Sequence, residues 1–433
     1  MISTPASQQQ QSSAAERIRA AARSLALERN VVVMSSSLLV LLSASFTWQR
    51  LIPLILRDYG ASDMAVGVAF FMISLGHALP QVLGGIVADR WGRKVAIVVP
   101  GVLAIGIYLM MSVTRSWAVL AFLIFCNRCM GAIQAPSFAA ILAESVSREK
   151  RGMAFAMFQV ATGLGYTVGP LVGAFLLRSY QVHRLMAINA LALAIATAMR
   201  WFLLSETAWG PAGGPPADRE PLNIAELRRA SARVWQAVWR PGGRLILAAG
   251  TLFTLVLTMT TQGPYIPMHA QDVLGFDKAQ VNLLFSAGPG VAITVSLAVG
   301  SLIRRWGPAA VLLVGAAGFG PLLALWLGSA SFAAGMAVFT AAYVFLQVAT
   351  IAYDTLRAEL VEGQGRGLAL GILGAMTGTV AALGPPLASW LRERTHPLMP
   401  FWLTFAAIGL MVALLAGNAL PRRSRRTFTA QPR

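Results

Sequence analysis

The sequence contains few charged residues, and acidic residues are the scarcer kind. Charged side chains make up 12% of the 433 residues, with 17 Asp and Glu against 35 Lys and Arg. A soluble globular domain carries about a quarter charged residues, so a chain that is 56% hydrophobic cannot cover its apolar content with a water-facing shell. The scarcity of charge therefore excludes an ordinary soluble domain and indicates a membrane protein.

Cysteine and histidine are also rare, with two and four residues respectively. Cys126 and Cys129 form a C-x-x-C pair, but the further ligands that a metal site requires are missing from the sequence around them. The sequence has no P-loop, no clustered His or Cys residues and no G-x-S-x-G motif. We therefore expect no metal, no cofactor and no enzymatic activity, and an ion or solute gradient rather than ATP as the energy source.

Long hydrophobic runs are abundant. A helix needs about twenty apolar residues to cross the hydrocarbon core of a bilayer. Twelve such runs follow one another, at 31–56, 64–88, 95–113, 117–142, 153–177, 184–204, 245–266, 280–303, 309–328, 331–356, 367–391 and 398–419. Because the runs lack the alternation of a β-barrel, and because helices satisfy their own backbone hydrogen bonds, the predicted fold class is an all-α membrane protein with twelve transmembrane helices.

The basic residues are unevenly distributed between the two sides of the predicted membrane. With a cytoplasmic N-terminus, most of the 35 Lys and Arg residues fall in cytoplasmic segments, while Arg50 and Arg128 lie inside spans. The exceptions on the outer side are Arg57, Arg115, Arg178, Arg184, Lys278, Arg392 and Arg394. The positive-inside rule then places both termini in the cytoplasm, and the start of the chain lacks the short apolar core of a signal peptide. We expect a multi-pass protein of the plasma (cell inner) membrane, with no nucleic acid as partner despite the net charge of +18.

The sequence repeats itself at an offset of 215 residues, since 85–92 is matched by 300–307. Further matched pairs are Glu144 and Glu359, Arg151 and Arg366, Thr162 and Thr377, and Gly169 and Gly384. A constant offset across charged, Trp and Gly positions predicts two six-helix halves around a site at their interface. The predicted domains are a tail at 1–30, a bundle at 31–204, a cytoplasmic linker at 205–244, a second bundle at 245–420 and a basic tail at 421–433.

The linker contains a stretch with helical amphipathicity. Residues 222–239 place Leu227, Ala230, Val234 and Val238 on one face and three arginines on another. This pattern predicts an interfacial helix on the cytoplasmic surface of the membrane. A regulatory docking site is the alternative.

The segment GIVADRWGRK at 85–94 resembles the signature between helices 2 and 3 of the major facilitator superfamily, G-x-L-A-D-R-x-G-R-K, with Val87 where Leu is usual. Residues 128–131 look like the family's helix-4 arginine motif, with the glycine one residue early. Residues 165–174 resemble the helix-5 motif associated with antiporters, with Ala174 in place of its closing glycine. The resemblance covers the whole chain and implies a secondary transporter that works by alternating access.

The resemblance also implies a conformational gate at the cytoplasmic ends of the helices. Asp89 is expected to meet the N-terminal end of helix 11 near Arg366, where the helix dipole and the guanidinium both favour an anion. Arg304 stands at the equivalent position of the second half, so the gate is asymmetric. The expected gate residues are Gly85, Asp89, Arg90, Gly92, Arg93, Lys94, Glu144, Arg151, Glu359 and Arg366. The helix-5 motif adds Gly165, Gly169, Pro170 and Gly173, which permit close helix packing, with a plain packing seam as the alternative.

In this family helices 1, 4, 7 and 10 line the central cavity, and polar residues follow the segments predicted for them. The expected cavity residues are Thr47, Arg50, Asn127, Arg128, Gln134, Thr258, Gln262, Tyr265, Tyr343 and Gln347. At 3.6 residues per turn the sets on helices 1, 7 and 10 each fall on one face. The alternative is that each hydroxyl bonds only to its own helix. Arg50 is suited to bind a carboxylate or phosphate, or alternatively to snorkel to the outer surface.

Proton coupling requires a titratable group within reach of both sides of the membrane. Asp354 is the only acid clearly on a cavity stripe, and its alternative role is a static partner of Arg357. His77 and Arg128 are further coupling candidates, with packing as the alternative for His77. The leading prediction is a monomeric antiporter that exports a small organic molecule in exchange for protons, or for Na⁺ in their place. The alternatives are a transporter of an organic anion bound by Arg50 and Arg128, and a transporter-like membrane sensor.

Overall fold

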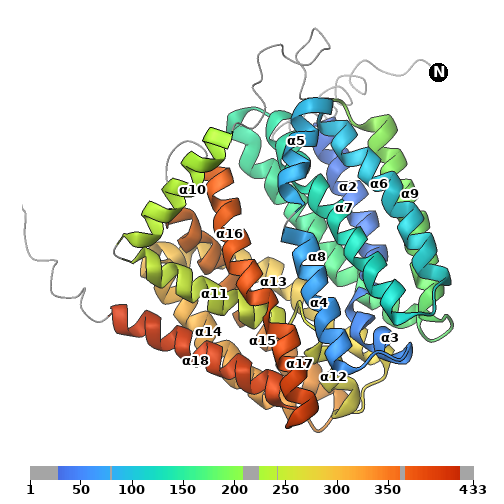
Figure 1. Cartoon of the computed structure of the whole chain (residues 1–433), viewed down its shortest axis with the longest axis vertical. Coiled ribbons are helices and arrows are strands. Elements are labelled where there is room, and N and C mark those ends of the chain that lie inside the picture. The colour runs from blue at the N-terminus through green and yellow to red at the C-terminus, as the bar shows by residue number, and fades with distance from the viewer. Residues whose placement is uncertain (1–27, 79, 208–223, 241, 361–365, 420–433) are drawn as a thin grey trace, which may run out of the picture.

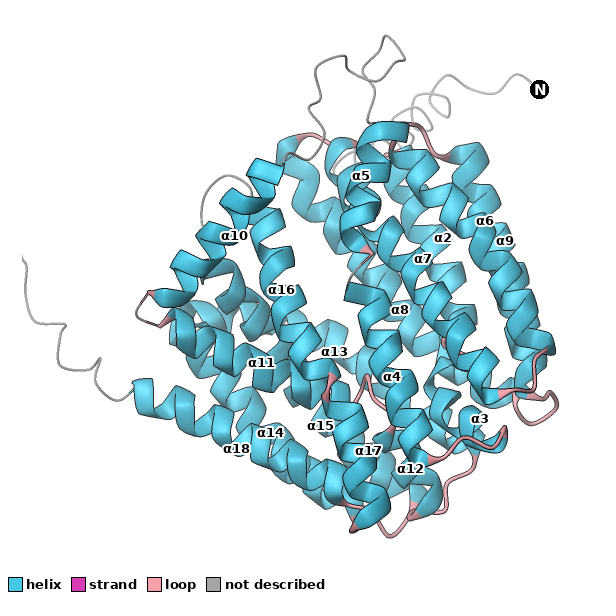
Figure 2. Cartoon of the chain, viewed as in Figure 1, coloured by secondary structure: helices cyan, strands magenta, loops and turns pink. Residues whose placement is uncertain are grey.

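The computed structural model describes residues 28–78, 80–207, 224–240, 242–360 and 366–419, and the regular elements in those residues are all helices (Figures 1 and 2). Within the described residues, nine helices are long and apolar enough to cross a membrane, or ten if one bent pair counts as a single span. The remaining predicted spans consist of two shorter helices in sequence. The predicted fold class, an all-α membrane protein, is confirmed, and described helices fall on all twelve predicted segments.

The helices up to residue 203 form what we call the first bundle. It contains α2 (Arg29–Ser45), η1 (Gln49–Leu51), α3 (Ile52–Asp58), α4 (Asp63–Ala78), α5 (Gln81–Trp91), α6 (Arg93–Val113), α7 (Trp117–Glu144), η2 (Arg148–Lys150), α8 (Arg151–Leu176) and α9 (Val182–Leu203). The second predicted span is divided between α4 and α5, next to Pro80. Proline cannot donate a backbone hydrogen bond inside a helix. The helix therefore breaks at the proline in this span, Pro80.

The helices from residue 243 onward form the second bundle. It contains α11 (Gly243–Met259), α12 (Tyr265–Asp272), α13 (Lys278–Trp306), α14 (Pro308–Leu327), α15 (Phe332–Leu360), α16 (Arg366–Ala382), α17 (Gly384–Arg394) and α18 (Met399–Ala419). Between the bundles, α10 (Ile224–Trp239) lies where the linker predicts a helix. The seventh and eleventh predicted spans are each divided in two, as α11 with α12 and α16 with α17.

Two matching hairpins explain the glycine that the sequence repeat places at the same position in each half. Gly92 separates α5 from α6 and has φ of 97°, and Gly307 separates α13 from α14 and has φ of 81°. This region of conformational space favours glycine, because a side chain would clash with the backbone. The charged residues at 89–94 therefore flank a turn in which one residue reverses the chain.

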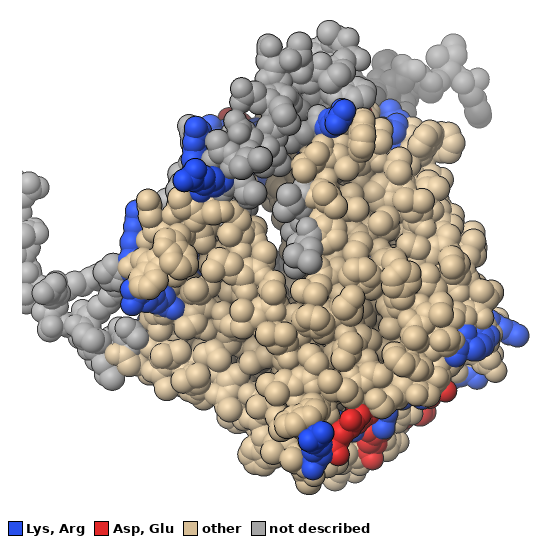
Figure 3. Space-filling model, viewed as in Figure 1, with Lys and Arg blue, Asp and Glu red and all other residues tan. Residues whose placement is uncertain are grey.

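The two bundles meet mainly through α8 against α13 and through α4 against α16 and α17. Figure 1 shows α3, α12 and α17 gathered at one end of the molecule, while α5 and α10 lie at the other. We call these the α3–α12–α17 end and the α5–α10 end. The space-filling view shows a hollow between the bundles towards the α5–α10 end, and a continuous surface towards the α3–α12–α17 end (Figure 3).

Candidate functional site

Two arginines and two aspartates join four helices at the α3–α12–α17 end. Arg392 contacts both acids, with Nε 2.7 Å from Oδ2 of Asp63 and Nη2 2.7 Å from Oδ2 of Asp272. Arg57 contacts the same pair, with Nη1 2.8 Å from Oδ2 of Asp272 and Nε 3.3 Å from Oδ1 of Asp63. Arg57 and Asp63 belong to the first bundle, and Asp272 and Arg392 to the second. We call these four residues the ionic cluster, and it ties the two bundles together.

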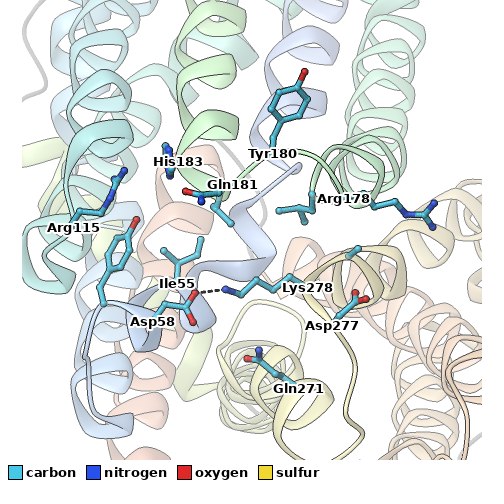
Figure 4. A pocket seen from close by; sticks show the side chains of 14 residues that line it. Ile55, Asp58, Arg115, Arg178, Tyr180, Gln181, His183, Gln271, Asp277 and Lys278 are labelled. Atoms are coloured by element: carbon cyan, nitrogen blue, oxygen red, sulfur yellow. Dashed lines mark hydrogen bonds and ion pairs between the residues drawn. The ribbon is translucent and has the colours of Figure 1, made fainter.

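Further contacts strengthen the connection at this end. Lys278, the first residue of α13, forms an ion pair with Asp58 of α3, and Figure 4 shows it reaching across from the second bundle. The backbone N–H of Met64 donates to Oε1 of Glu393 over 2.7 Å. A surface pocket of about 660 Å³ lies beside the Asp58–Lys278 pair, and residues of both bundles line it (Figure 4). Both bundles therefore contribute walls to this pocket.

Arg50 lies where the bundles meet. It belongs to η1, and its Nη1 donates to the backbone carbonyl of Thr261 in the second bundle. Its guanidinium carbon lies 5.0 Å from the centre of the Phe46 ring and 4.8 Å from that of Phe285, so one ring comes from each bundle. Such cation–π contacts stabilise a cation away from water. The buried Nε of Arg50 has no hydrogen-bond partner among the described residues.

Among the described residues, no acid is within electrostatic range of Arg50. Tyr166, Tyr343 and Arg128 lie within electrostatic range of its guanidinium. The Tyr166 ring packs edge-on against Phe46 at 4.5 Å between centroids. The surroundings of Arg50 therefore combine positive charge, aromatic rings and phenolic hydroxyls, which suit an organic molecule with an acidic group.

A hydrogen-bonded network lies beside Arg128 in the first bundle. Nη2 of Arg128 is 3.5 Å from Oε1 of Gln49, and Nε2 of Gln49 donates to the Tyr108 hydroxyl over 3.3 Å. Nδ2 of Asn127 donates to the same hydroxyl over 3.2 Å. His77 of α4 is exposed and lies within electrostatic range of Arg128. The predicted residues Asn127 and Arg128 thus come together with Gln49 and Tyr108, which the sequence analysis did not select.

The cavity residues predicted on helix 7, Thr258, Gln262 and Tyr265, form no hydrogen bond with Arg50 or Arg128 within the described part of the chain. The Tyr265 hydroxyl donates to the Pro385 carbonyl over 2.5 Å and is 3.0 Å from Oγ of Ser389. Oγ1 of Thr258 is 2.9 Å from the Leu255 carbonyl, and Gln262 is exposed in the turn between α11 and α12. The single stripe assumed an unbroken helix, but α11 ends at Met259 and the turn shifts the register. Tyr265 and Thr258 therefore face the core of the second bundle.

The remaining cavity candidates show mixed positions. The Thr47 hydroxyl bonds back to the Ala44 carbonyl over 2.6 Å, while its own carbonyl accepts from Nδ2 of Asn282 in the second bundle over 2.5 Å. Oε1 of Gln134 accepts from Nη1 of Arg200 over 3.4 Å. Tyr343 and Gln347 are both half-buried on α15. Arg200 is 1% exposed. It lies four residues from the end of the predicted span 184–204, and the sequence analysis did not select it as a charge inside a span.

Asp354 does not lie beside Arg50. Its Oδ1 accepts from Nη2 of Arg357 over 3.1 Å, one turn along α15, and its side chain is 55% exposed. Glu359, in the last turn of the same helix, is also exposed. The structure thus contains the ion pair with Arg357 that the sequence analysis gave as the alternative for Asp354.

Three of the predicted gate residues, Arg93, Lys94 and Glu144, make contacts at the hairpin of Gly92. The backbone N–H groups of Arg93 and Lys94 donate to the carboxylate of Glu206 over 3.0 and 2.9 Å. A carboxylate at this position accepts hydrogen bonds from free N–H groups, and the positive end of the α6 dipole stabilises its negative charge. Nη2 of Arg93 is also 3.5 Å from Oε1 of Glu144. Glu206 was not predicted, because the sequence analysis treated 205–244 as a linker.

The other gate candidates make local contacts. Nε of Arg151 donates to the Ala143 carbonyl over 3.0 Å, and the Arg90 guanidinium lies 5.9 Å from the centre of the Trp91 ring. The side chains of Asp89 and Arg366 lie outside the described residues. The contact predicted between them therefore stays a prediction.

The helix-5 glycines pack α8 against α2. A Cβ built on Gly165 would lie 2.6 Å from Cβ of Leu42, and one on Gly169 would lie 2.8 Å from the Ser43 carbonyl oxygen. At Gly173 the added atom would meet the carbonyl of Thr47, and would lie 2.6 Å from Nδ2 of Asn282 on α13. Gly165 and Gly169 thus pack against α2 inside the first bundle, while Gly173 also meets α13 of the second bundle. Pro170 lies buried within the same helix.

Comparison with known proteins gives the family. The sequence profile of the Major Facilitator Superfamily matches residues 33–350 and 248–432. The chain is 25% identical to the multidrug resistance protein MdtG of Yersinia enterocolitica over 304 residues, which is 68% of this chain and 70% of that protein. It is 26% identical to MdtG of Salmonella typhi over 262 residues, 59% of this chain and 61% of that protein.

Solved structures show the same fold. The nucleoside transporter NupG superposes with a TM-score of 0.71 at 14% identity, covering 91% of this chain and 99% of NupG. The human organic anion transporter MFSD10 superposes with a TM-score of 0.61 at 20% identity, covering 89% of this chain and 99% of that one. Twelve predicted spans, the motif at 85–94 and these matches agree, and this chain belongs to the Major Facilitator Superfamily of membrane transporters.

Proposed function

We propose that the protein exports a small organic molecule with an acidic group, and that Arg50 binds that group. The observation that carries the proposal is the guanidinium of Arg50, which lies between the bundles with a buried Nε that has no hydrogen-bond partner among the described residues. Arg128 adds positive charge, while Phe46, Phe285 and Tyr166 supply aromatic surface. Export is supported by the multidrug resistance relatives, and an anionic substrate by the fold relative named as an organic anion transporter.

The joined end supplies the second part of the proposal. The positive-inside rule assigns the α3–α12–α17 end to the outside of the cell and the α5–α10 end to the cytoplasm. The ionic cluster then closes the outer side, and the hollow between the bundles faces the cytoplasm (Figure 3). This is the state in which an exporter takes up its substrate. Rocking of the two bundles around Arg50 would release the substrate outside.

As a second candidate function, we propose that export is coupled to proton antiport through Asp354. The observation that favours it is the position of Asp354 on α15, where its carboxylate is 55% exposed and the charge of Arg357 lies one turn away. A carboxylate that exchanges a proton with water can make or release this ion pair during the transport cycle. The two proposals are compatible, because Arg50 would bind the substrate and Asp354 would carry the proton that drives transport.

Transport by the full chain in proteoliposomes tests both parts, with fluorescein as the organic anion and ethidium as the matched organic cation. We expect Arg50→Gln to weaken fluorescein binding by about tenfold or more, because a hydrogen bond to a charged group contributes roughly 1.5–3 kcal/mol. Arg50→Lys should recover part of the affinity, since it keeps the charge but loses the planar guanidinium. Arg184→Gln, an exposed arginine beside Tyr180, is the control and should bind as the native chain does.

The same assay separates substrate binding from coupling. Under an imposed pH gradient, Asp354→Asn should lose gradient-driven accumulation while retaining downhill exchange of substrate. Accumulation by Asp354→Asn equal to that of the native chain would refute the coupling role. Unchanged fluorescein affinity in Arg50→Gln would refute the anion site, and ethidium transport with no fluorescein transport would refute the substrate class.

A further inference from the structure

A basic and aromatic surface covers α10 and the start of α11. We call it the α10 surface, and it consists of Arg228, Arg229, Trp235, Trp239, Arg240 and Arg244, all exposed. Figure 3 shows Lys and Arg side chains along the edge of the molecule where Figure 1 places α10. Between residues 224 and 244 the sequence has five arginines and one acid, Glu226. This surface is not part of the Arg50 site or of the ionic cluster.

On the α10 surface, the exposed rings of Trp235 and Trp239 contact each other, and Arg244 packs over Trp239. The rings of Trp235 and Trp239 pack edge to face with centroids 5.5 Å apart. The guanidinium carbon of Arg244 lies 3.8 Å from the centre of the Trp239 ring. The two Trp side chains remain 59% and 51% exposed. Arg228, Arg229, Arg240 and Arg244 are also exposed, and within the described residues no carboxylate forms an ion pair with any of them.

The opposite face of α10 fixes this surface in place. Val234 and Val238 are buried against Leu373 of α16, and Leu247 of α11 packs on the same small core. The chain also turns tightly between α10 and α11, because a Cβ on Gly243 would meet the carbonyl of Ala237. The α10 surface is therefore held at the first turn of a predicted membrane span, at the level where a bilayer has its headgroups.

We propose that the α10 surface binds the headgroups of anionic phospholipids in the adjacent leaflet. Arginine pairs with phosphate through charge-assisted hydrogen bonds, basic residues next to a span attract anionic lipids, and exposed Trp rings prefer the membrane interface. A free phosphate ion would use the arginines but would leave the Trp pair in water. Because α10 packs on both α11 and α16, bound lipid holds the α5–α10 end of the second bundle to the membrane.

Thermal unfolding of the full chain in neutral detergent tests the proposal, with phosphatidylglycerol, phosphatidylcholine and glycerol phosphate as probes. Phosphatidylglycerol should raise Tm, while phosphatidylcholine and glycerol phosphate at equal concentration should not. Each arginine near the surface should contribute about fivefold to the affinity, so Arg240→Gln with Arg244→Gln should weaken the effect of phosphatidylglycerol by about 25-fold. The matched control is Arg178→Gln with Arg184→Gln at the α3–α12–α17 end, which should respond as the native chain does.

Four results would overturn the proposal. They are an equal response to phosphatidylcholine, an equal response to glycerol phosphate, an unchanged response of the Arg240 and Arg244 double variant, and a Tm raised by an acidic peptide but not by lipid. If that double variant does not fold, Arg228→Gln with Arg229→Gln changes two exposed arginines on α10 itself and should weaken the response by a similar factor. Neither measurement involves a transport substrate, so the result is independent of the proposed function.

Discussion

Gly173 of α8 lies against the turn that follows α2 and against Asn282 of α13. A methyl group there would overlap the Thr47 carbonyl and crowd Nδ2 of Asn282, which itself donates to that carbonyl. We expect Gly173→Ala to lower the free energy of unfolding by about 1–3 kcal/mol, the usual cost of overpacking, as measured by thermal unfolding in detergent. Gly106→Ala is the control, because no atom lies within 4 Å of the added Cβ. Equal Tm values for the two variants would contradict this account of the seam.

At the scale of single residues, the sequence selected some of the residues that form the candidate site, and it missed others for physical reasons. The sequence singled out Arg50 and Arg128 because a charge inside a span is costly unless it is solvated or paired. Tyr265 was assigned to the cavity because periodicity assumes an unbroken helix, but the turn after Met259 rotates it into the core of the second bundle. Gln49 contacts Arg128 through tertiary packing, which no local pattern reveals.

The helix ends α3, α4, α12 and α17 are held together by the ionic cluster. The side chain of Arg392 is 6% exposed and touches both Asp63 and Asp272, so its loss should cost more than the roughly 0–1 kcal/mol of a surface pair. Arg392→Gln also removes one of the two positive charges that screen Asp63 from Asp272, so the two carboxylates repel each other more strongly. We therefore expect faster hydrogen exchange in α12 and α17, measured by mass spectrometry.

Arg394→Gln is the matched control for Arg392→Gln. Arg394 lies two residues further along α17, where its guanidinium packs over the Trp390 ring at 4.9 Å. Its loss should leave exchange in α12 unchanged. If both variants exchange alike, the ionic cluster does not hold this end closed.

The elements themselves were more predictable than their contacts. Hydrophobic runs placed the spans, and the offset of 215 residues placed the hairpins at Gly92 and Gly307, because both signals are local. The ionic cluster joins residues 57, 63, 272 and 392, which are each ordinary charged residues at helix ends in the sequence. Only the packing of one bundle on the other brings them together.

The whole molecule is joined at the α3–α12–α17 end, so the proposed rocking of the bundles makes a prediction about both ends at once. Spin labels at Trp91 and Arg305 report the α5–α10 end, and labels at Tyr180 and Val273 report the other, all at exposed positions. The two native cysteines, Cys126 and Cys129, are first replaced by serine. In a variant with Arg57→Gln and Arg392→Gln, the distance between Tyr180 and Val273 should lengthen.

In the same molecules, the distance between Trp91 and Arg305 should shorten. This follows because a rigid bundle that swings away at one end must approach at the other, with Arg50 and the Thr47–Asn282 contact near the pivot. Removing both arginines should change the ratio of the two states by tenfold or more if the ionic cluster contributes about 1.4 kcal/mol. A lengthened Tyr180–Val273 distance with an unchanged Trp91–Arg305 distance would show local opening of helix ends, and would rule out rigid-body rocking as the way this transporter exposes Arg50 to each side.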